Sequence, residues 1–327
     1  MPEMTMVQAI NTTLFEEMRR NEKVLVMGED VGVDGGVFRV TDGLIDEFGD
    51  QRVFDTPLAE AGIIGTATGL AIAGFRPVAE LQFMGFSYHG FYHIENHVAR
   101  FRKRTQGRFT VPLVVRIPYG AGVHALEHHS ESRETYYIHT PGIKVVVPSS
   151  PRKAHDLLLA ALRDPDPVIF LEPKALYRHG KEEVPEEADT PAELGKADIV
   201  REGEDLVIIS YGAMLPRSLE AAETLAEEDG VSAEVIDLVT LSPMDSGTVI
   251  ESVKKTGRAV VVHEAPRSLG LGSEIVARIN DQCLLWLEAP VARVTGYDIQ
   301  VPLFSREEEY LPGEDRILNA AREVLGF

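Results

Sequence analysis

The stretch DTPLAEAGIIGTATGLA, residues 55–71, decides the fold class, because a predicted strand ends in it and a buried helix begins. Residues 62–71 are nearly all small or apolar, which predicts a helix that protein covers on all sides. Glu60 stands at the start of this helix. Parallel α/β sheets bind ligands at the carboxyl ends of their strands. The stretch therefore indicates an α/β unit with a candidate site at Glu60.

The sequence on either side continues to alternate strand and helix patterns. Apolar runs without polar alternation predict strands covered on both faces, as in a parallel sheet, and they lie at residues 24–27, 77–81, 113–117, 145–147 and 168–171. Helical patterns fall between them, at residues 6–20 (with Thr5 as the cap), 58–73, 86–103 and 151–163. This order predicts a doubly wound α/β domain over residues 1–180.

A polar stretch rich in proline and glutamate, residues 181–194, predicts an interdomain linker. The alternation then resumes, with strands expected at 206–209, 233–236 and 259–262 and helices at 214–228, 245–255, 270–281 and 315–325. We therefore expect a second, smaller α/β domain over residues 195–327.

The composition excludes several classes of protein. A formal net charge of −20 argues against nucleic-acid binding and favours basic partners. Either ordinary solubility or adaptation to salt accounts for this acidity. The single cysteine, Cys283, cannot form an internal disulfide and fits a reducing compartment. No membrane span, signal peptide or transit peptide is recognisable, so the predicted location is the cytoplasm, away from membranes.

Two histidine-rich segments are further candidate sites. The loop at residues 119–130 contains His124, Glu127, His128 and His129, which suit a zinc site or an acid–base group. Their spacing matches no standard zinc pattern, so a catalytic or substrate-facing histidine is the preferred interpretation.

The second segment places His89, His93 and His97 at four-residue intervals on a predicted helix. Such spacing can bind a metal, but no glutamate completes a hydrolase motif, and histidines at an interface are the simpler interpretation. Glu60 also has a simpler alternative, a carboxylate stabilised by the helix dipole, which spacing alone favours. From the residues alone, the chain is a two-domain α/β enzyme or enzyme subunit of unknown chemistry.

Seven segments, in order along the chain, resemble the beta subunits of thiamine-diphosphate-dependent pyruvate and branched-chain 2-oxo acid dehydrogenases. They are DTPLAE (55–60), FMGF (83–86), HHS (128–130), PGIKVV (141–146), FLEP (170–173), TGR (256–258) and LEAPVARVTG (287–296). The likeness covers nearly the whole chain, which makes it specific. It implies a pyrimidine-binding α/β domain followed by a smaller transketolase-type C-terminal domain.

The resemblance also implies roles for particular residues. Glu60 would hydrogen-bond a ring nitrogen of the cofactor's aminopyrimidine, since a partly desolvated carboxyl can share a proton with such a nitrogen. Phe86 would pack on that ring, and Tyr88 would be the other cofactor-binding residue. His129 would assist acyl transfer to a lipoyl group, whereas the position of His128 varies in the family.

Metal ions are implied in two places. A potassium ion, held mostly by carbonyl oxygens, would lie at positions Leu113, Ala161, Leu162, Asp164 and Asp166. Magnesium and the cofactor's diphosphate are held in such enzymes by a Gly-Asp-Gly segment, which does not occur in this sequence. The resemblance therefore implies an alpha subunit that supplies the magnesium site, in an α2β2 heterotetramer.

The implied activity is oxidative decarboxylation of pyruvate or a branched-chain 2-oxo acid, with transfer of the acyl group to the lipoyl group of an acyltransferase component. One alternative is the C-terminal subunit of a split transketolase-like enzyme, which needs cationic side chains for sugar phosphates. The loop at 119–135 offers only Arg133 for that purpose. The other alternative is a scaffold subunit without catalysis. The sequence leaves open the choice of 2-oxo acid and the core architecture of the complex.

Overall fold

The computed structural model describes residues 1–185 and 191–327. These residues form two compact units, Met1–Tyr119 with Tyr136–Leu194, and Gly120–Thr135 with Gly195–Phe327. Residues 120–135 therefore pack with the second unit, although the sequence places them inside the first. The linker predicted at 181–194 includes residues 186–190, which lie outside the described part of the chain.

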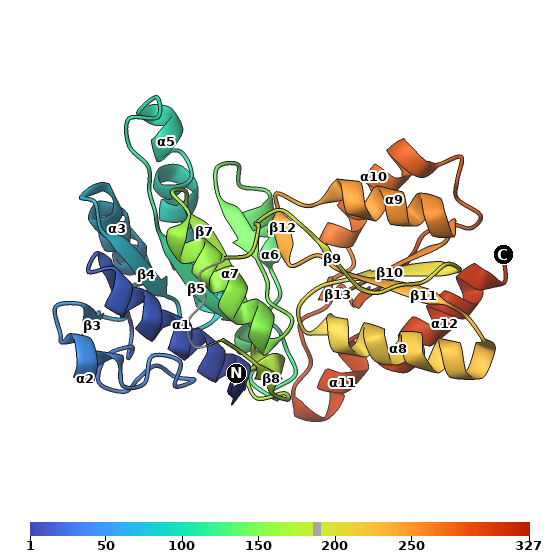
Figure 1. Ribbon diagram of the computed structural model, residues 1–327, viewed down its shortest axis with the longest axis horizontal. Coiled ribbons are helices and arrows are strands. Elements are labelled where there is room, and N and C mark those ends of the chain that lie inside the picture. Colours follow the sequence, from blue (N-terminus) through green and yellow to red (C-terminus); the bar gives the residue numbers. More distant parts are fainter. Residues whose placement is uncertain (186–190) are drawn as a thin grey trace. The chain divides into compact units, whose positions relative to one another are not determined.

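The first unit contains a parallel sheet with the strand order β6-β7-β5-β4-β2-β3 (Figure 1). Its strands are β2 (Val24–Gly28), β3 (Val53–Asp55), β4 (Arg76–Glu80), β5 (Val114–Tyr119), β6 (Lys144–Val146) and β7 (Val168–Pro173). The residues of β2, β5 and β7 are all buried, as the unbroken apolar runs predict. A short antiparallel pair, β1 (Glu3–Met4) with β8 (Glu182–Glu183), lies apart from this sheet.

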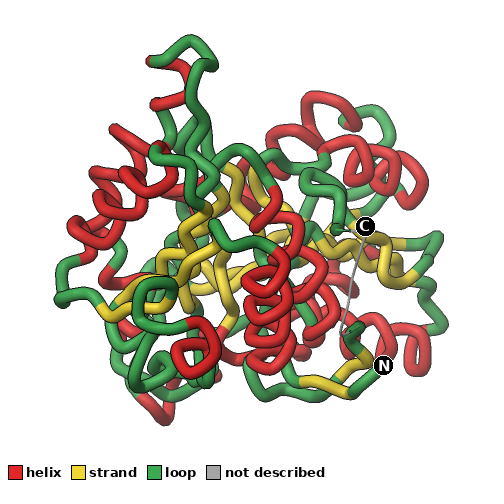
Figure 2. The backbone as a smooth tube through the Cα atoms, turned by 60° about the vertical axis from the view of Figure 1, so that its left-hand side comes forward, coloured by secondary structure: helices red, strands yellow, loops and turns green. Residues whose placement is uncertain are grey.

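Two helix pairs cover the two faces of this sheet (Figure 2). Helix α1 (Met6–Arg20) packs on α7 (Pro151–Arg163), and α3 (Glu60–Ile72) packs on α4 (Tyr88–His93). Thr5 caps α1 by accepting a hydrogen bond from the Gln8 amide, as its sequence predicts. The doubly wound α/β domain is thus confirmed. The short elements α2 (Leu44–Phe48) and η4 (Lys174–Leu176) also belong to this unit, and α6 (Glu134–Ile138) spans its boundary at residue 136.

The helical stretch predicted at 86–103 is present, but it is not one continuous helix. The segment instead contains a 3-10 turn (η1, Met84–Phe86), α4, a π-helical turn (η2, Ile94–Val98) and α5 (Phe101–Arg104). A π turn inserts an extra residue into the helical repeat, so side chains beyond it leave the face that four-residue spacing predicts.

A buried arginine joins three neighbouring strands of the first unit. Arg116 on β5 donates to Glu172 on β7, through Nε at 2.6 Å and Nη2 at 2.9 Å, and through Nη1 to Glu80 on β4 at 2.5 Å. Tyr177 also donates to Glu172, at 2.5 Å. All four groups are buried. Burial raises the pKa of Glu80, although the charge of Arg116 opposes this effect.

We predict that Arg116→Met will lower the free energy of unfolding by about 3–5 kcal/mol, because two buried carboxylates would lose their cation. Urea denaturation followed by circular dichroism measures this loss. Arg102→Met is the matched control, since it removes only a surface ion pair with Asp166 and should cost at most about 1 kcal/mol. Equal losses in both variants would contradict the prediction.

The second unit has a five-stranded sheet in the order β14-β13-β10-β11-β9. Its strands are β9 (Asp198–Arg201), β10 (Leu206–Ser210), β11 (Ala233–Asp237), β13 (Ala259–Pro266) and β14 (Ala292–Gly296), and only β9 pairs antiparallel. Figure 1 shows one helix pair on each face: α8 (Met214–Asp229) with α12 (Glu314–Leu325), and α9 (Ser246–Thr256) with α10 (Leu271–Cys283). The shorter elements are β12 (Thr240–Ser242), η5 (Phe304–Arg306) and α11 (Glu307–Tyr310). Among the described residues, none of the helices has both the length and the apolar character to cross a bilayer.

His263 on β13 is fully buried in this unit. Its ring stacks on Tyr211, with centroids 6.1 Å apart, and the backbone of Gly270 and Gly272 lies against it. A Cβ atom added to Gly272 would lie 2.7 Å from the ring Nε2. Burial, together with the positive charge of Arg293, lowers the pKa of His263 from 6.5 to about 4.

This shift predicts a loss of stability in mild acid. The unfolded chain binds a proton at this histidine near pH 6.5, whereas the folded chain does so only near pH 4, so acidification favours unfolding within that interval. Between pH 6.5 and 4, the loss in the free energy of unfolding that is due to this histidine reaches roughly 3 kcal/mol. The His263→Leu variant should lack this acid-dependent loss. Urea denaturation of the wild-type protein and the variant at pH 7.5 and pH 5 tests this. A constant difference between them at the two pH values would refute it.

Candidate active site

Hydrogen bonds that fix the chain just before α3 determine the position of Glu60. The carboxylate of Asp55, at the end of β3, accepts hydrogen bonds from the amides of Gly32 (2.6 Å) and Val33 (3.2 Å). The Thr56 amide donates to the carbonyl of Gly28, at the end of β2, at 2.8 Å. Glu60 then begins α3, beyond the carboxyl edge of the sheet, where ligands bind in folds of this kind.

The Glu60 side chain is almost completely buried, with 8% of its surface exposed. Its Oε2 lies 3.5 Å from Nδ1 of His89 on α4. Gly90 allows this approach, because a Cβ there would lie 3.0 Å from a side-chain carbon of Ile64 on α3. Within the described residues, no donor hydrogen-bonds the Glu60 carboxylate. It can therefore accept a hydrogen bond from a group outside this unit.

The other predicted cofactor residues lie on the segment that leads into α4. Phe86 belongs to η1, and its ring packs edge-on against Phe83 with centroids 5.5 Å apart. Tyr88 begins α4 and is half exposed, with its ring 5.9 Å from that of Tyr136. Since α4 packs on α3, the segment that contains Phe86 and Tyr88 is fixed next to the helix that begins with Glu60.

Glu29 is a further candidate site residue, which the sequence did not suggest. It directly follows β2, a neighbour of β3 in the sheet. Burial raises the pKa of Glu29, and the charges of Asp30 and Glu60 add to the effect. The sequence signal that could have identified Glu29 is its position directly after an apolar strand, at the same edge of the sheet as Glu60.

The predicted histidine stripe does not form one cluster. His89 directs Nδ1 toward Glu60, whereas His93 and His97 lie together beyond it, with ring centroids 5.5 Å apart. His89 and His93 both lie on α4, and His97 lies in the π turn that follows. In the described part of the chain, no group of three or more His, Cys, Asp or Glu side chains is arranged to hold a metal ion.

The other predicted catalytic residue lies in the second unit, on what we call the histidine loop (residues 120–131). His128 and His129 belong to a 3-10 turn, η3 (Glu127–His129), with ring centroids 4.3 Å apart. The Gly120 amide donates to the Glu131 carbonyl at 2.9 Å and closes the loop. Buried Ser130 donates to the carbonyl of Leu126 at 3.1 Å. The loop therefore has an ordered backbone that presents two adjacent imidazoles.

The five positions predicted for potassium lie in the first unit, where protein donors already engage their oxygens. The carbonyls of Leu162 and Asp164 both accept from Nη1 of Arg76, at 2.7 and 3.1 Å. The Asp164 carboxylate pairs with Lys144 at 2.5 Å, and that of Asp166 pairs with Arg102. The remaining two carbonyls accept backbone amides, Leu113 from Val168 and Ala161 from Asp164.

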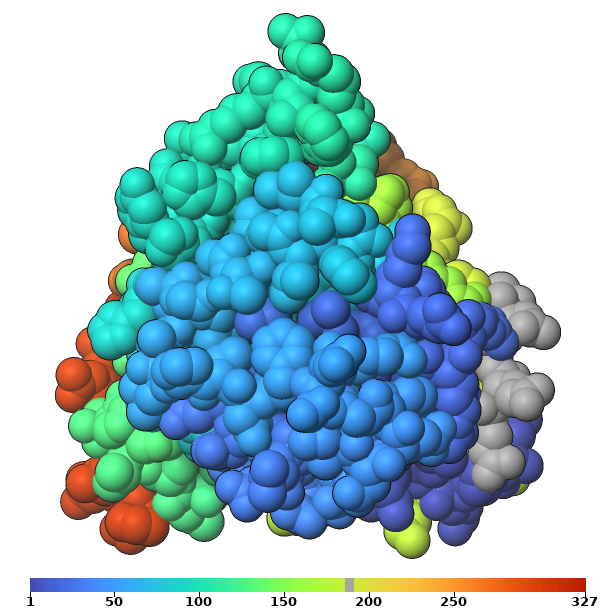
Figure 3. Space-filling view, turned by 90° about the vertical axis from the view of Figure 1, so that its left-hand side faces the viewer, coloured from blue at the N-terminus to red at the C-terminus, as the bar shows by residue number. Residues whose placement is uncertain are grey.

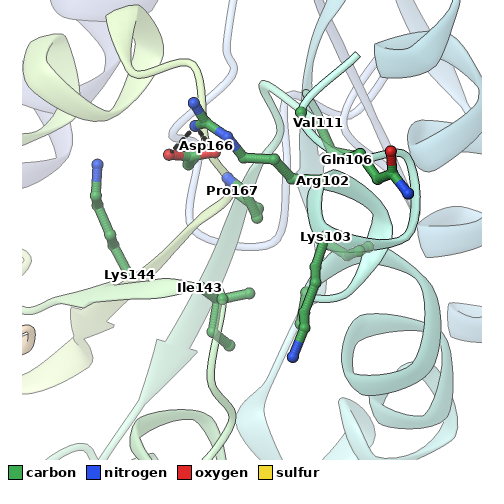
Figure 4. A pocket seen from close by; sticks show the side chains of 12 residues that line it. Arg102, Lys103, Gln106, Val111, Ile143, Lys144, Asp166 and Pro167 are labelled. Atoms are coloured by element: carbon green, nitrogen blue, oxygen red, sulfur yellow. Dashed lines mark hydrogen bonds and ion pairs between the residues drawn. The ribbon is translucent and has the colours of Figure 1, made fainter. Parts of the chain in front are cut away.

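A groove of 570 Å³ lies beside these residues (Figure 4). Its apolar lining includes Val98, Val111 and Ile143, and Arg102 reaches across one side to Asp166 at 2.6 Å. The adjoining segment, residues 100–108, contains five cationic side chains and no acidic one. This segment begins with α5 and projects from the first unit (Figures 1 and 3). The groove shares no residue with the predicted cofactor site.

Comparison with known proteins agrees with this architecture. Residues 2–180 match the family model "Transketolase, pyrimidine binding domain", and residues 195–317 match "Transketolase, C-terminal domain". A solved structure titled "Split gene transketolase, inactive beta4 tetramer" superposes with a TM-score of 0.80 over 99% of both chains, at 24% identity. That likeness shows the fold alone. The chain is thus built from the two transketolase-type α/β domains that its sequence predicts.

Curated relatives define the family more narrowly. The chain is 54% identical to the pyruvate dehydrogenase E1 component subunit beta of Bacillus subtilis, over the full length of both. It is 51% identical to the proteins of the same name from Staphylococcus epidermidis and Staphylococcus aureus, again over both full lengths. The chain belongs to the family of pyruvate dehydrogenase E1 beta subunits. The family resemblance seen in the sequence is thereby confirmed.

Proposed function

We propose that this chain, with a separate alpha subunit, decarboxylates pyruvate by means of thiamine diphosphate and passes the acyl group to a lipoyl arm. The observation that carries the proposal is the Glu60 carboxylate, which is nearly buried at the carboxyl edge of the sheet and accepts no hydrogen bond from the described residues. Pyruvate is favoured over a branched-chain 2-oxo acid because the relatives at 51–54% identity are named for pyruvate.

The residues of the first unit suit the aminopyrimidine part of the cofactor. Glu60 would share a proton with a ring nitrogen: its carboxyl group would donate a hydrogen bond to the nitrogen when protonated and accept one after the proton has moved. Phe86 and Tyr88 would bound the ring, and burial of Glu60 would exclude competing water. Thiamine diphosphate itself supplies the electron sink for cleavage of the bond to the carboxylate. His89, 3.5 Å from Glu60, supplies a neighbouring titratable group.

His129 has a separate proposed role in the transfer of the acyl group. An imidazole changes charge near neutral pH, so it can hold or give the proton that a lipoyl sulfur needs. Its position on the closed histidine loop would keep the ring in place for this step. His128 lies beside it and receives no assigned role.

The partner proposals follow from what this sequence lacks. Without a Gly-Asp-Gly segment, the ligands for magnesium and diphosphate would come from the alpha subunit, in an α2β2 heterotetramer. The acyltransferase component is the second proposed partner, and the net charge of −20 suits a basic docking domain. The proposed location is the cytoplasm, with no membrane or nucleic acid as partner.

The split transketolase alternative has weaker support. The structural likeness at 24% identity concerns the fold. A sugar phosphate needs cationic side chains, and in the histidine loop region Arg133 lies 3.8 Å from Glu131, so that its charge is partly compensated.

A potassium ion would have to share its oxygen ligands with Arg76, because the Leu162 and Asp164 carbonyls converge on that guanidinium. Each carbonyl has a second lone pair for this purpose. If the ion binds, we expect a melting temperature about 2–4 °C higher in potassium chloride than in sodium chloride at equal ionic strength. Calorimetry of the assembled complex measures it, and identical values in the two salts would remove potassium from the proposal.

The proposed function is tested by 2-oxo acid decarboxylation with an artificial electron acceptor, in the presence of thiamine diphosphate and magnesium. We expect no activity from this chain alone and activity after co-expression with its alpha subunit, with pyruvate as the preferred substrate. Glu60→Gln should lower the rate of the complex by about 100-fold or more.

The matched control for this test is Glu95→Gln, which removes a carboxylate that pairs with Arg100 at the surface. It should leave the rate unchanged. Full activity of the Glu60→Gln complex would favour a scaffold role for this chain. Activity of the chain alone would show that it needs no magnesium site from a partner.

A further inference from the structure

The first residues of the histidine loop have an unusual backbone. Gly120, Gly122 and His124 have positive φ angles of 83°, 91° and 54°, and each alternates with a residue of ordinary φ. Alternation of this kind turns successive amide groups toward one side and creates a concave site for an anion. Positive φ is uncommon for a residue with a side chain such as His124. The surroundings of the loop must therefore compensate for this conformation.

Two buried carboxylates of the second unit occupy the concave side. Glu264, near the end of β13, accepts a hydrogen bond from the Ala121 amide at 3.1 Å. Glu307, the first residue of α11, accepts from the Gly122 amide through Oε1, and from the His124 amide at 3.4 Å. Its Oε2 lies 3.5 Å from Nδ1 of His124. The fold thus supplies its own anions to the loop.

The fit between the loop and Glu264 leaves no spare room. A Cβ atom added to Gly120 would lie 2.3 Å from Oε1 of Glu264 and 3.0 Å from its carboxyl carbon. Such a contact is shorter than any tolerated separation, and the positive φ of Gly120 independently disfavours a side chain. Glycine at position 120 is thus required by the approach of the carboxylate.

The chain that leaves the loop is also held by a buried carboxylate. Glu134 accepts a hydrogen bond from the hydroxyl of Tyr211, on the same unit, at 2.5 Å. Burial raises the pKa of Glu134, an effect that this hydrogen bond partly opposes. Between the two anchored ends lies η3, with His128 and His129 less buried than the carboxylates.

We propose that Glu264 and Glu307 are positioning residues for His129, which they hold in place through the backbone amides of the histidine loop. The inference rests on the role of His129 in acyl transfer proposed above. Charge-assisted hydrogen bonds are among the strongest in proteins. Loss of donors is costly for a buried carboxylate, so opening of the loop would cost the hydrogen bonds that its amides donate to both groups. The two glutamates therefore restrict the loop to one conformation.

The experiment uses the assembled complex with alpha subunit, thiamine diphosphate and magnesium. Glu307→Gln keeps an acceptor but removes the charge that strengthens the amide hydrogen bonds. We expect the ratio of lipoyl acylation to artificial-acceptor decarboxylation to fall about tenfold, and amide hydrogen exchange in residues 120–124 to rise by about the same factor. His129→Asn should lower the same ratio without a rise in exchange.

Matched controls separate this role from general damage. Glu308→Gln changes the adjacent, exposed carboxylate, which pairs with Arg217 at the surface, and should alter neither rate. Gly120→Ala should reproduce the Glu307→Gln result through the clash with Glu264. Gly107→Ala should not, because a Cβ there meets nothing within 4 Å despite a similar φ of 77°.

Two outcomes decide the proposal. Unchanged exchange at residues 120–124 together with an unchanged rate ratio in Glu307→Gln would overturn it. Equal losses in both rates, accompanied by a lower melting temperature, would also overturn it, because they indicate a merely structural role. If the wild-type complex decarboxylates no 2-oxo acid, the proposed function fails, whereas the exchange measurement still reports on the anchoring of the loop.

Discussion

A carboxylate that is buried on folding needs hydrogen-bond donors from the protein. In both units, this requirement brings separate segments of the chain together. In the first unit, Arg116 supplies the donors for Glu80 and Glu172 and so joins three strands. In the second unit, backbone amides supply them for Glu264 and Glu307. In each case, the buried charge specifies which segments of the chain must meet.

Glu60 stands out against this pattern. It is nearly as buried as the others, but its neighbour in the described structure is a histidine at 3.5 Å rather than a hydrogen-bond donor at bonding distance. Folding energy alone does not select such an arrangement, because a glutamine or a methionine would be simpler to bury. A group that binds next to Glu60 and brings its own donor would compensate for the burial.

The sequence predicted those parts of the fold that depend on local signals. Helix α1 starts at Met6 and ends at Arg20 as predicted, because the Thr5 cap and the apolar period act within the segment. The end of strand β3 at Asp55 was predicted, but not its start, because its three residues are too few for a pattern. The membership of residues 120–135 in the second unit was also missed, since the contacts that determine it join Gly122 to Glu307, far apart in the sequence. The family motifs led to Glu60 and His129 as candidate site residues, whereas the candidate Glu29 needed the order of the strands.

The basic segment at residues 100–108 gives the chain a pronounced charge asymmetry. Five cationic side chains lie in this one segment, two of them paired with Glu95 and Asp166, while the chain as a whole has a net charge of −20. Such a distribution is an electric dipole, and the field of an approaching molecule exerts a torque on it. The torque orients the two molecules before they touch, and it acts over about 8 Å at physiological ionic strength. Encounters with charged partners are thus biased in orientation from the start, and this bias weakens as salt is added.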